Sequence, residues 1–431
     1  MSFRFIHAAD IHLDSPLLSL DEYPGAPVEE IRLATRKALG RLVDFSIESD
    51  AAFVVIAGDL FDSEWRDCNT GLYFISEMKK LRDVGIKAYI ELGNHDAANR
   101  MRAGLPWPDH IRFFDYKQPE RIPVPDCDAA LYSQSFRLPH VDEDLTSTWP
   151  IGDPGTFNIG VLHTSAGGAP GHELYAPCSL DSLRSRHYQY WALGHIHSRM
   201  ELAKEPWVVF SGNIQGRHVR ECGPRGCYLV DVDDHGGVKL TFQPLDVVRW
   251  QVLRVAVDEE TAPVDVEALA QEAIDRAVAE ADGRTLAVRI RLEGSGPAWN
   301  RAAADVPGLR SRIRMLAQDA AVPVHVEKLE LAAVAPKRRD EQDSGPIAEL
   351  RSLIDEFREG DSLMPELQAE FADLKSKLEA SIPPTICPHV PMLKSWPNSR
   401  YTLRQTSNSG VSVSRIRPSK SKIKAFIISF P

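Results

Sequence analysis

The sequence lacks any apolar run near the roughly 20 residues that a membrane-spanning helix requires. Its longest apolar stretches, such as Ala51–Ala57, have the length of a strand. Only 6 cysteines occur in 431 residues, too few and too scattered for a disulfide framework, which predicts a reducing compartment. No internal repeat is present. The formal charge of −11 excludes a chain that is basic throughout, but a local basic patch or bound cations can still neutralise the phosphates of a nucleic acid.

The composition, with 43% hydrophobic and 26% charged residues, is typical of a folded, water-soluble chain, and its length predicts two or three domains. Strand-like and helix-like segments alternate over residues 1–245, which predicts an α/β domain with packed sheets. Two amphipathic helices, over 28–45 and 72–81, separate the first three strands. The expected strands are Phe3–Ala9, Ala52–Ala57, Lys87–Leu92, Asn158–Leu162, Tyr190–Leu193, Trp207–Ser211, Cys227–Asp233 and Val238–Leu245.

A second, smaller α+β domain is expected over residues 246–335, because strands and helices alternate again after Arg249. A charged linker with Pro and Gly follows at 336–344, and two amphipathic helices are expected over 345–382. The expected elements of the smaller domain are strands 250–257, 285–292 and 322–331 and helices 265–281 and 308–320.

The last segment, residues 383–431, carries 8 basic residues and no acidic one, whereas residues 340–382 carry 4 basic and 12 acidic residues. The last segment is rich in Pro and Ser and lacks helical or strand periodicity, so we interpret it as a disordered tail. Two alternatives stay open, namely a basic arm for nucleic acid and a non-native end from a shifted reading frame.

Five short motifs rich in Asp and His follow apolar, strand-like runs. Because ligands of an α/β sheet gather at the carboxyl ends of its strands, these motifs are expected to converge on one crevice. Oxygen donors and imidazoles without a thiolate suit Mn²⁺, Fe or Zn²⁺ and disfavour a structural zinc site of the Cys type. In chain order the motifs are Asp10-Ile11-His12, Gly58-Asp59-Leu60-Phe61-Asp62, Gly93-Asn94-His95-Asp96, His163 and Gly194-His195-Ile196-His197.

Each motif alone is weak evidence, since a strand-end Asp or His is more often a helix cap or an ordinary hydrogen-bonded residue. The joint pattern of seven candidate ligands in five ordered motifs favours a metal site.

The set of motifs resembles the calcineurin-like metallophosphoesterase superfamily over roughly residues 3–215. The resemblance implies a four-layer αββα sandwich and two divalent cations, with Mn²⁺ expected. It further implies that His95 is the catalytic histidine and Asp62 the carboxylate that orients it. By the same resemblance the first metal would be held by Asp10, His12, Asp59 and His197, and the second by Asp59, Asn94, His163 and His195.

Three features narrow the branch of this superfamily. Leu60-Phe61-Asp62-Ser63 replaces the Asp-Arg-Gly that follows in the protein phosphatases. The stretch 210–218 resembles the DNA repair exonuclease branch, which includes YhaO-type proteins. The order of phosphoesterase domain, smaller domain and helix pair resembles the SbcD-type nuclease subunit, in which the smaller domain caps DNA and the helices bind a partner.

The resemblance therefore predicts a metal-dependent DNA exonuclease or endonuclease, the nuclease subunit of a DNA repair complex. Its expected partners are DNA and an SMC-like ATPase bound through the helices at 345–381, with a homodimer left open and no membrane partner. Two alternatives are a phosphodiesterase or phosphatase for a nucleotide or other small phosphoester, and a scaffold with a degenerate metal site. Comparing hydrolysis of plasmid DNA with hydrolysis of a small phosphodiester would distinguish the nuclease from the small-phosphoester hydrolase. The complete set of candidate ligands argues against the scaffold.

Three residues after the last motif, Arg217, His218 and Arg220, are candidates for contact with DNA phosphates, or equally for a solvated loop. The expected location is the cytoplasm. A first strand at Phe3 and a ligand at Asp10 leave no room for a cleaved secretory leader.

Overall fold

The computed structural model describes residues 2–15, 26–62, 68–97, 104–168, 175–334, 401–406 and 410–415. Contacts divide the chain into two units, Met1–Lys337 and Arg338–Pro431, and each is described on its own. In the described residues no helix is both long enough and apolar enough to cross a bilayer.

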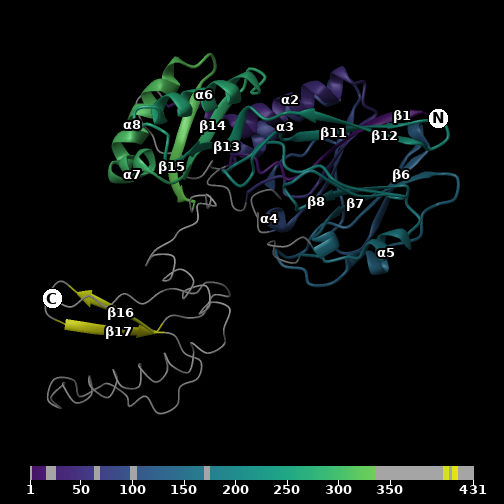
Figure 1. The fold of residues 1–431 in the computed structure, drawn as a ribbon. Coiled ribbons are helices and arrows are strands. Elements are labelled where there is room, and N and C mark those ends of the chain that lie inside the picture. Colours follow the sequence, from purple (N-terminus) through teal and green to yellow (C-terminus); the bar gives the residue numbers. More distant parts are fainter. Residues whose placement is uncertain are drawn as a thin grey trace, which may run out of the picture. The chain divides into compact units, whose positions relative to one another are not determined.

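The first unit is built around two six-stranded sheets (Figure 1). In the first sheet β1 to β4 run parallel, and β11 and β12 extend it antiparallel beside β1. In the second sheet β6, β7, β8 and β10 run parallel between the antiparallel edge strands β5 and β9.

The strands of both sheets have the following bounds. The first sheet has the order β12 (Val238–Pro244), β11 (Gly226–Val232), β1 (Phe3–Ala8), β2 (Phe53–Ala57), β3 (Lys87–Glu91) and β4 (Ile111–Phe113). The second has the order β5 (Glu120–Val124), β6 (Ala129–Ser133), β7 (Phe157–His163), β8 (Tyr190–Gly194), β10 (Trp207–Phe210) and β9 (Met200–Lys204). Four strands at or near the sheet edges were not predicted from the sequence, namely β4, β5, β6 and β9.

The two sheets pack face to face, with helices outside, which is the expected four-layer αββα sandwich. Alternation along β2 sends Phe53 and Val55 into the layer between the sheets, while Val54 and Ile56 face the helices. Because both faces are covered, β2 is apolar at every position. The helices outside the first sheet are α1 (Val28–Arg32), α2 (Ala34–Glu48) and α3 (Asn69–Asp83); α5 (Leu180–Arg184) lies outside the second.

A smaller three-stranded sheet follows in the same unit, with all strands parallel in the order β13-β14-β15. The helices α6 and α8 bury their apolar stripes against one face of this sheet, which forms a separate core cluster. The bounds are β13 (Val248–Val257), α6 (Val266–Ala279), β14 (Thr285–Gly294), α7 (Pro297–Ala304), α8 (Val306–Leu316) and β15 (Val324–Ala333). The sequence predicted one helix over 308–320; the structure shows α8 ending at Leu316 and an additional α7 before it.

The junction between the two parts of this unit is itself part of the main core. Leu245, Val248 and Trp250 are buried in the same apolar cluster as the residues of α2 and α3. The carboxylate of Asp246, which is fully buried, pairs with Arg249 at 2.8 Å and with Arg284 at 3.4 Å. The smaller domain is therefore anchored by packing and by buried charge.

In the second unit the described residues form an antiparallel hairpin of β16 (Tyr401–Thr406) and β17 (Gly410–Arg415). These strands lie within 383–431, where no strand periodicity was expected. The expectation was wrong for β17, in which Val411 and Val413 alternate with serines. The linker at 336–344, the helix pair at 345–382 and the remainder of 383–431 lie outside the described residues.

The buried histidine His7 on β1 generates a prediction about acid stability. Its Nδ1 lies 2.9 Å from the Tyr190 hydroxyl and its Nε2 lies 3.3 Å from the Leu193 carbonyl oxygen. Burial lowers the pKa of His7 to about 3, with the Leu193 carbonyl opposing the shift only in part. The unfolded chain therefore binds more protons than the native state between about pH 6.5 and 3, and stability falls as the pH falls through that window.

We expect metal-free protein to lose about 2 kcal/mol of unfolding free energy through His7 between pH 7 and pH 5. Urea unfolding of His7→Gln at both pH values should show a correspondingly smaller pH dependence. The exposed His235→Gln variant is the control and should retain the full dependence. An unchanged pH dependence in His7→Gln would contradict the assignment.

Candidate metal centre

The side chains singled out by sequence come from the carboxyl ends of strands in both sheets. The first sheet contributes residues that follow β1, β2 and β3; the second contributes the end of β7 and the residues after β8. The structure brings together Asp10, His12, Asp59, Asp62, Asn94, His95, His163, His195 and His197. Asn94 and His95 open the short helix α4 (Asn94–Ala97).

The backbone that carries these residues is unusual. Asp10, His12, Asp59 and His195 all have positive φ, between 43° and 94°, a region that costs side-chain-bearing residues energy. Two glycines are required by close approach, because a Cβ at Gly58 would overlap the imidazole of His163 and a Cβ at Gly93 would overlap the carboxylate of Asp59. The close contacts at the two glycines and the strained backbone of the four residues indicate that the surrounding packing holds these side chains in place.

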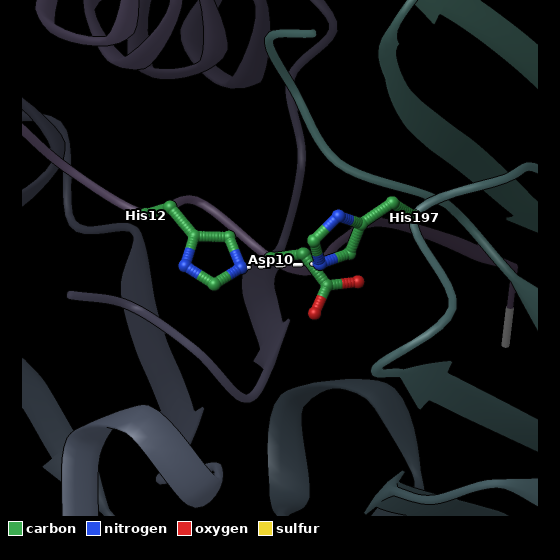
Figure 2. Close-up of side chains that lie close together, drawn as sticks. All are labelled: Asp10, His12 and His197. Atoms are coloured by element: carbon green, nitrogen blue, oxygen red, sulfur yellow. Dashed lines mark hydrogen bonds between the residues drawn. The ribbon is translucent and has the colours of Figure 1, made fainter. Parts of the chain in front are cut away.

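The first group of candidate ligands is Asp10, His12 and His197 (Figure 2). The Nε2 atoms of His12 and His197 face one another at 3.2 Å, a separation that suits two nitrogens each about 2.1 Å from one cation. Burial, followed by the charge of Arg217, lowers the pKa of His12 to about 3. The imidazole of His12 is therefore neutral at pH 7 and has a lone pair to offer.

The second group is centred on Asp59. Its Oδ2 lies 3.4 Å from His163 Nε2 and 3.7 Å from His12 Nε2, so this carboxylate stands between the two groups. The side-chain oxygen of Asn94 lies 2.9 Å from the same nitrogen of His163. His195 joins this side through its ring, whose centroid is 5.2 Å from that of His163, while its backbone N–H donates to Asp10.

The charges of this second group are strongly coupled. Burial opposes ionisation of Asp59, but the imidazoles of His163 and His12 outweigh it and lower the pKa of that carboxyl. Burial likewise disfavours the charged form of His163, but Asp59 and Asp10 outweigh it and raise the pKa of His163 to about 10. A cation bound here would replace the proton on His163, as metal binding to imidazoles requires.

His95 and Asp62 form a pair beside these groups. Asp62 Oδ1 lies 3.1 Å from His95 Nδ1, and its Oδ2 accepts a hydrogen bond from the Ser15 hydroxyl at 2.8 Å. The hydrogen bond to Asp62 raises the pKa of His95 despite partial burial. The pair can therefore hold a proton near neutral pH at the edge of the cluster.

The residues present fit a pair of hard or borderline divalent cations. The donor atoms are carboxylate and amide oxygens and imidazole nitrogens, with no sulfur among them. Asp10, His12, Asp59 and His163 are all buried, and buried carboxylates in such proximity need compensating positive charge. The roles of individual residues as ligands stay predictions.

The structure places two buried carboxylates, Glu221 and Asp96, against the candidate ligands, and sequence reasoning gave neither a role. Glu221 lies behind His197, with Oε1 2.7 Å from Nδ1 of that imidazole. Asp96 accepts hydrogen bonds from the backbone N–H groups of Leu60, Phe61 and Gly93, and so joins two of the ligand-bearing loops. Asp96 belongs to the motif Gly93-Asn94-His95-Asp96, but it was given no role from the sequence. Glu221 lies in none of the five motifs, so no sequence pattern indicates its contact with His197.

The three candidate DNA contacts occupy different environments. The guanidinium of Arg217 lies at the cluster, with Nη1 3.7 Å from Asp62 Oδ1 and Nη2 3.4 Å from His197 Nδ1. His218 is partly exposed and lies 3.5 Å from Glu221, and Arg220 is exposed. Arg217 is thus the one of these three whose cationic group the structure places beside the candidate ligands.

Comparison with known proteins gives two family matches and several relatives. Residues 3–199 match the calcineurin-like phosphoesterase family, and residues 250–334 match the middle domain of metallophosphoesterase YhaO. The uncharacterized metallophosphoesterase YhaO of Bacillus subtilis is 31% identical over 305 residues, covering 68% of this chain and 72% of that protein.

Two DNA double-strand break repair proteins named Mre11 are more distant relatives. The protein from Methanopyrus kandleri is 24% identical over 349 residues, covering 68% of this chain and 74% of its own length. The protein from Saccharolobus solfataricus is 23% identical over 279 residues, covering 59% of this chain and 68% of its own length.

The geometry predicts different consequences for two substitutions in the cluster. His95→Ala removes a proton-holding group outside the candidate ligand set, so hydrolysis should fall by at least about 10²-fold while two metals per chain remain bound. Asp59→Ala removes the carboxylate between the two groups and should lose metal. Metal content after gel filtration, measured by mass spectrometry, checks both. Loss of both metals from folded His95→Ala would reverse the assignment of His95.

Proposed function

The chain belongs to the calcineurin-like metallophosphoesterases and, through its middle domain, to the YhaO-like family, and we propose that it is a dimetal-dependent DNA nuclease. The proposed reaction is hydrolysis of phosphodiester bonds in DNA, within a DNA repair complex. The observation that carries the proposal is the position of Asp59 between His12 from the first sheet and His163 from the second. The similarity to the Mre11 protein of Methanopyrus kandleri, which covers 68% of this chain, supports the choice of DNA as substrate.

The proposed ligands follow the two groups in the structure. We assign Asp10, His12, Asp59 and His197 to the first cation and Asp59, Asn94, His163 and His195 to the second, with Mn²⁺ as the proposed metal. Bound there, two divalent cations would polarise a phosphoryl group as Lewis acids and activate a water as nucleophile. The neutral side chain of Asn94 limits negative charge where an anionic phosphate has to enter.

The proposed catalytic pair is His95 with Asp62. Asp62 holds Nδ1 of the ring and favours its protonated form, so that Nε2 is the nitrogen that would protonate the leaving oxygen. Ser15 fixes the Asp62 carboxylate from the other side. Asp62 thus acts as a positioning residue for His95.

Arg217 is proposed to contact the phosphate that is cleaved. Its side chain is 16% exposed and lies within reach of Asp62, His197 and the Ser15 hydroxyl, in contact with the cluster itself. A guanidinium presents several donors in a plane that matches phosphate oxygens. His218 and Arg220 would contact the DNA backbone farther along, where they add affinity without sequence preference.

The choice of DNA over a small phosphoester is tested by comparing substrates. Purified protein should degrade end-labelled DNA in Mn²⁺ far faster than it hydrolyses bis-p-nitrophenyl phosphate, and chelation of the metal should abolish both activities. Turnover of the small diester or of a nucleotide without turnover of DNA would support the alternative of a small-phosphoester hydrolase instead.

Removal of the Arg217 guanidinium should slow DNA cleavage. We expect Arg217→Met to lower kcat/KM by roughly 10²-fold or more, since a charged donor at a phosphoryl group contributes about 3–4 kcal/mol. Arg217→Lys should recover only part of the loss, because an ammonium lacks the planar donor set. The exposed Arg184→Met on α5 is the matched control. Equal rates for Arg217→Met and wild type would remove Arg217 from the site.

An SMC-like ATPase is proposed as partner, bound through residues 345–381, which the sequence pattern predicts to form two helices. The stripes containing Leu353 and Phe371 are apolar, and two short helices bury little surface unaided. Leu353→Glu with Phe371→Glu should abolish co-purification with the ATPase while leaving cleavage of short DNA unchanged. Wild-type affinity for the ATPase in this variant would exclude the helix pair as the docking site.

A further inference from the structure

A buried carboxylate, that of Glu221, stands on the far side of His197 from the other candidate ligands. Glu221 is 5% exposed, and its Oε1 lies 2.7 Å from His197 Nδ1. The opposite nitrogen of the same ring, Nε2, lies 3.2 Å from His12 Nε2. The imidazole of His197 therefore bridges a carboxylate on one side and the first group of candidate ligands on the other.

This arrangement fixes which ring nitrogen carries the proton. An ionised carboxylate can only accept hydrogen bonds, so Nδ1 of His197 has to be the donor toward Glu221. The rest of this carboxylate also faces donors, because Oε2 accepts from two N–H groups and Arg217 Nη2 lies 3.8 Å from Oε1. With the proton on Nδ1, the lone pair of Nε2 points toward His12 and Asp10, where a cation would be held.

Glu221 is itself held in place by its own loop. Its Oε2 accepts a hydrogen bond from the Arg217 backbone N–H at 2.7 Å and another from the Asn213 side-chain amide at 2.9 Å. Gln215 in the same loop donates to the Val248 carbonyl on β13 at 2.6 Å. The indole of Trp250, also on β13, donates to the Gly216 carbonyl at 3.0 Å.

We propose that Glu221 is a positioning residue for the first cation. It orients the His197 ring and keeps the ring proton on Nδ1. The loop 213–221, which carries Glu221, is hydrogen-bonded to β13 of the smaller domain. The inference rests on the proposed assignment of His197 as a ligand. A purely structural Glu221 would stabilise the loop and leave the intrinsic metal affinity unchanged, so metal affinity distinguishes the two roles.

The test measures Mn²⁺ binding to the full chain by isothermal titration calorimetry, together with the melting temperature of the metal-free protein. Glu221→Gln, which keeps the side-chain size, should weaken one of the two sites by roughly 10–100-fold and leave the other near the wild-type value. Glu221→Asp should recover part of that affinity by restoring a charged acceptor. Cobalt substitution supplies a second readout, because the visible absorption of one Co²⁺ should change.

Glu327→Gln in the smaller domain is the matched control, because Glu327 is also 5% exposed and pairs with Arg289 at 2.7 Å. It should lower the melting temperature without changing either metal affinity. Wild-type affinity at both sites in folded Glu221→Gln would overturn the inference. Should Glu221→Gln fail to fold, folded Glu221→Ser, which also lacks the carboxylate, takes its place, and wild-type affinity at both sites in that variant would overturn the inference.

His197→Ala separates failure of this inference from failure of the proposed function. Weaker binding at one site in His197→Ala, with no change in Glu221→Gln, would refute the role of Glu221 alone. Two undiminished sites in His197→Ala would refute the ligand assignment and the inference together.

Discussion

The close approach of β2 to β7 is the constraint on which the rest of the site depends. Phe53 and Val55 from one sheet pack with Val161 from the other in the layer between the sheets. That packing brings the strand ends so near that a Cβ at Gly58 would overlap the ring of His163, and it leaves Asp59 Oδ2 3.4 Å from His163 Nε2. One carboxylate is thereby shared between imidazoles from two sheets, and every other candidate ligand is arranged around it.

The same approach gathers buried negative charge that requires compensation. Asp10 and Asp59 are both buried, and the cost of placing two carboxylates in a low-dielectric layer is reduced only by positive charge beside them. In the metal-free protein a proton on His163 supplies part of that charge, which is why its pKa rises to about 10. The positive φ of Asp10, His12, Asp59 and His195 adds on the order of 1 kcal/mol of strain for each residue. The apolar layers on either side offset both costs, so the site is maintained by packing rather than by its own contacts.

The strand and helix pattern allowed an α/β domain with packed sheets and the smaller domain to be predicted, and the resemblance implied the four-layer sandwich. The clustering of the motifs was predictable because each follows an apolar strand and strand ends converge. The sequence could not reveal Glu221, whose contact with His197 depends on the course of the loop 213–221 and not on any spacing along the chain. Arg217 was predicted only as one of three candidates for contact with DNA phosphates; its position beside Asp62 follows from the same loop. The strands β4, β5, β6 and β9 were missed because they are short or lie at or near sheet edges, where alternation is weak.

The junction at residues 245–250 connects the smaller domain physically to the candidate site. Leu245, Val248 and Trp250 belong to the main core, and the buried Asp246 pairs with arginines from the smaller domain. The Gln215 side chain accepts the Val247 N–H and donates to the Val248 carbonyl, so the loop that holds Arg217 and Glu221 shares its hydrogen bonds with β13. Separating the domains would exchange these hydrogen bonds for bonds to water, at a net cost of about 0.5–1.5 kcal/mol each. His197 is therefore connected to β13 through two hydrogen-bonded steps, from β13 to the loop and from Glu221 to the ring.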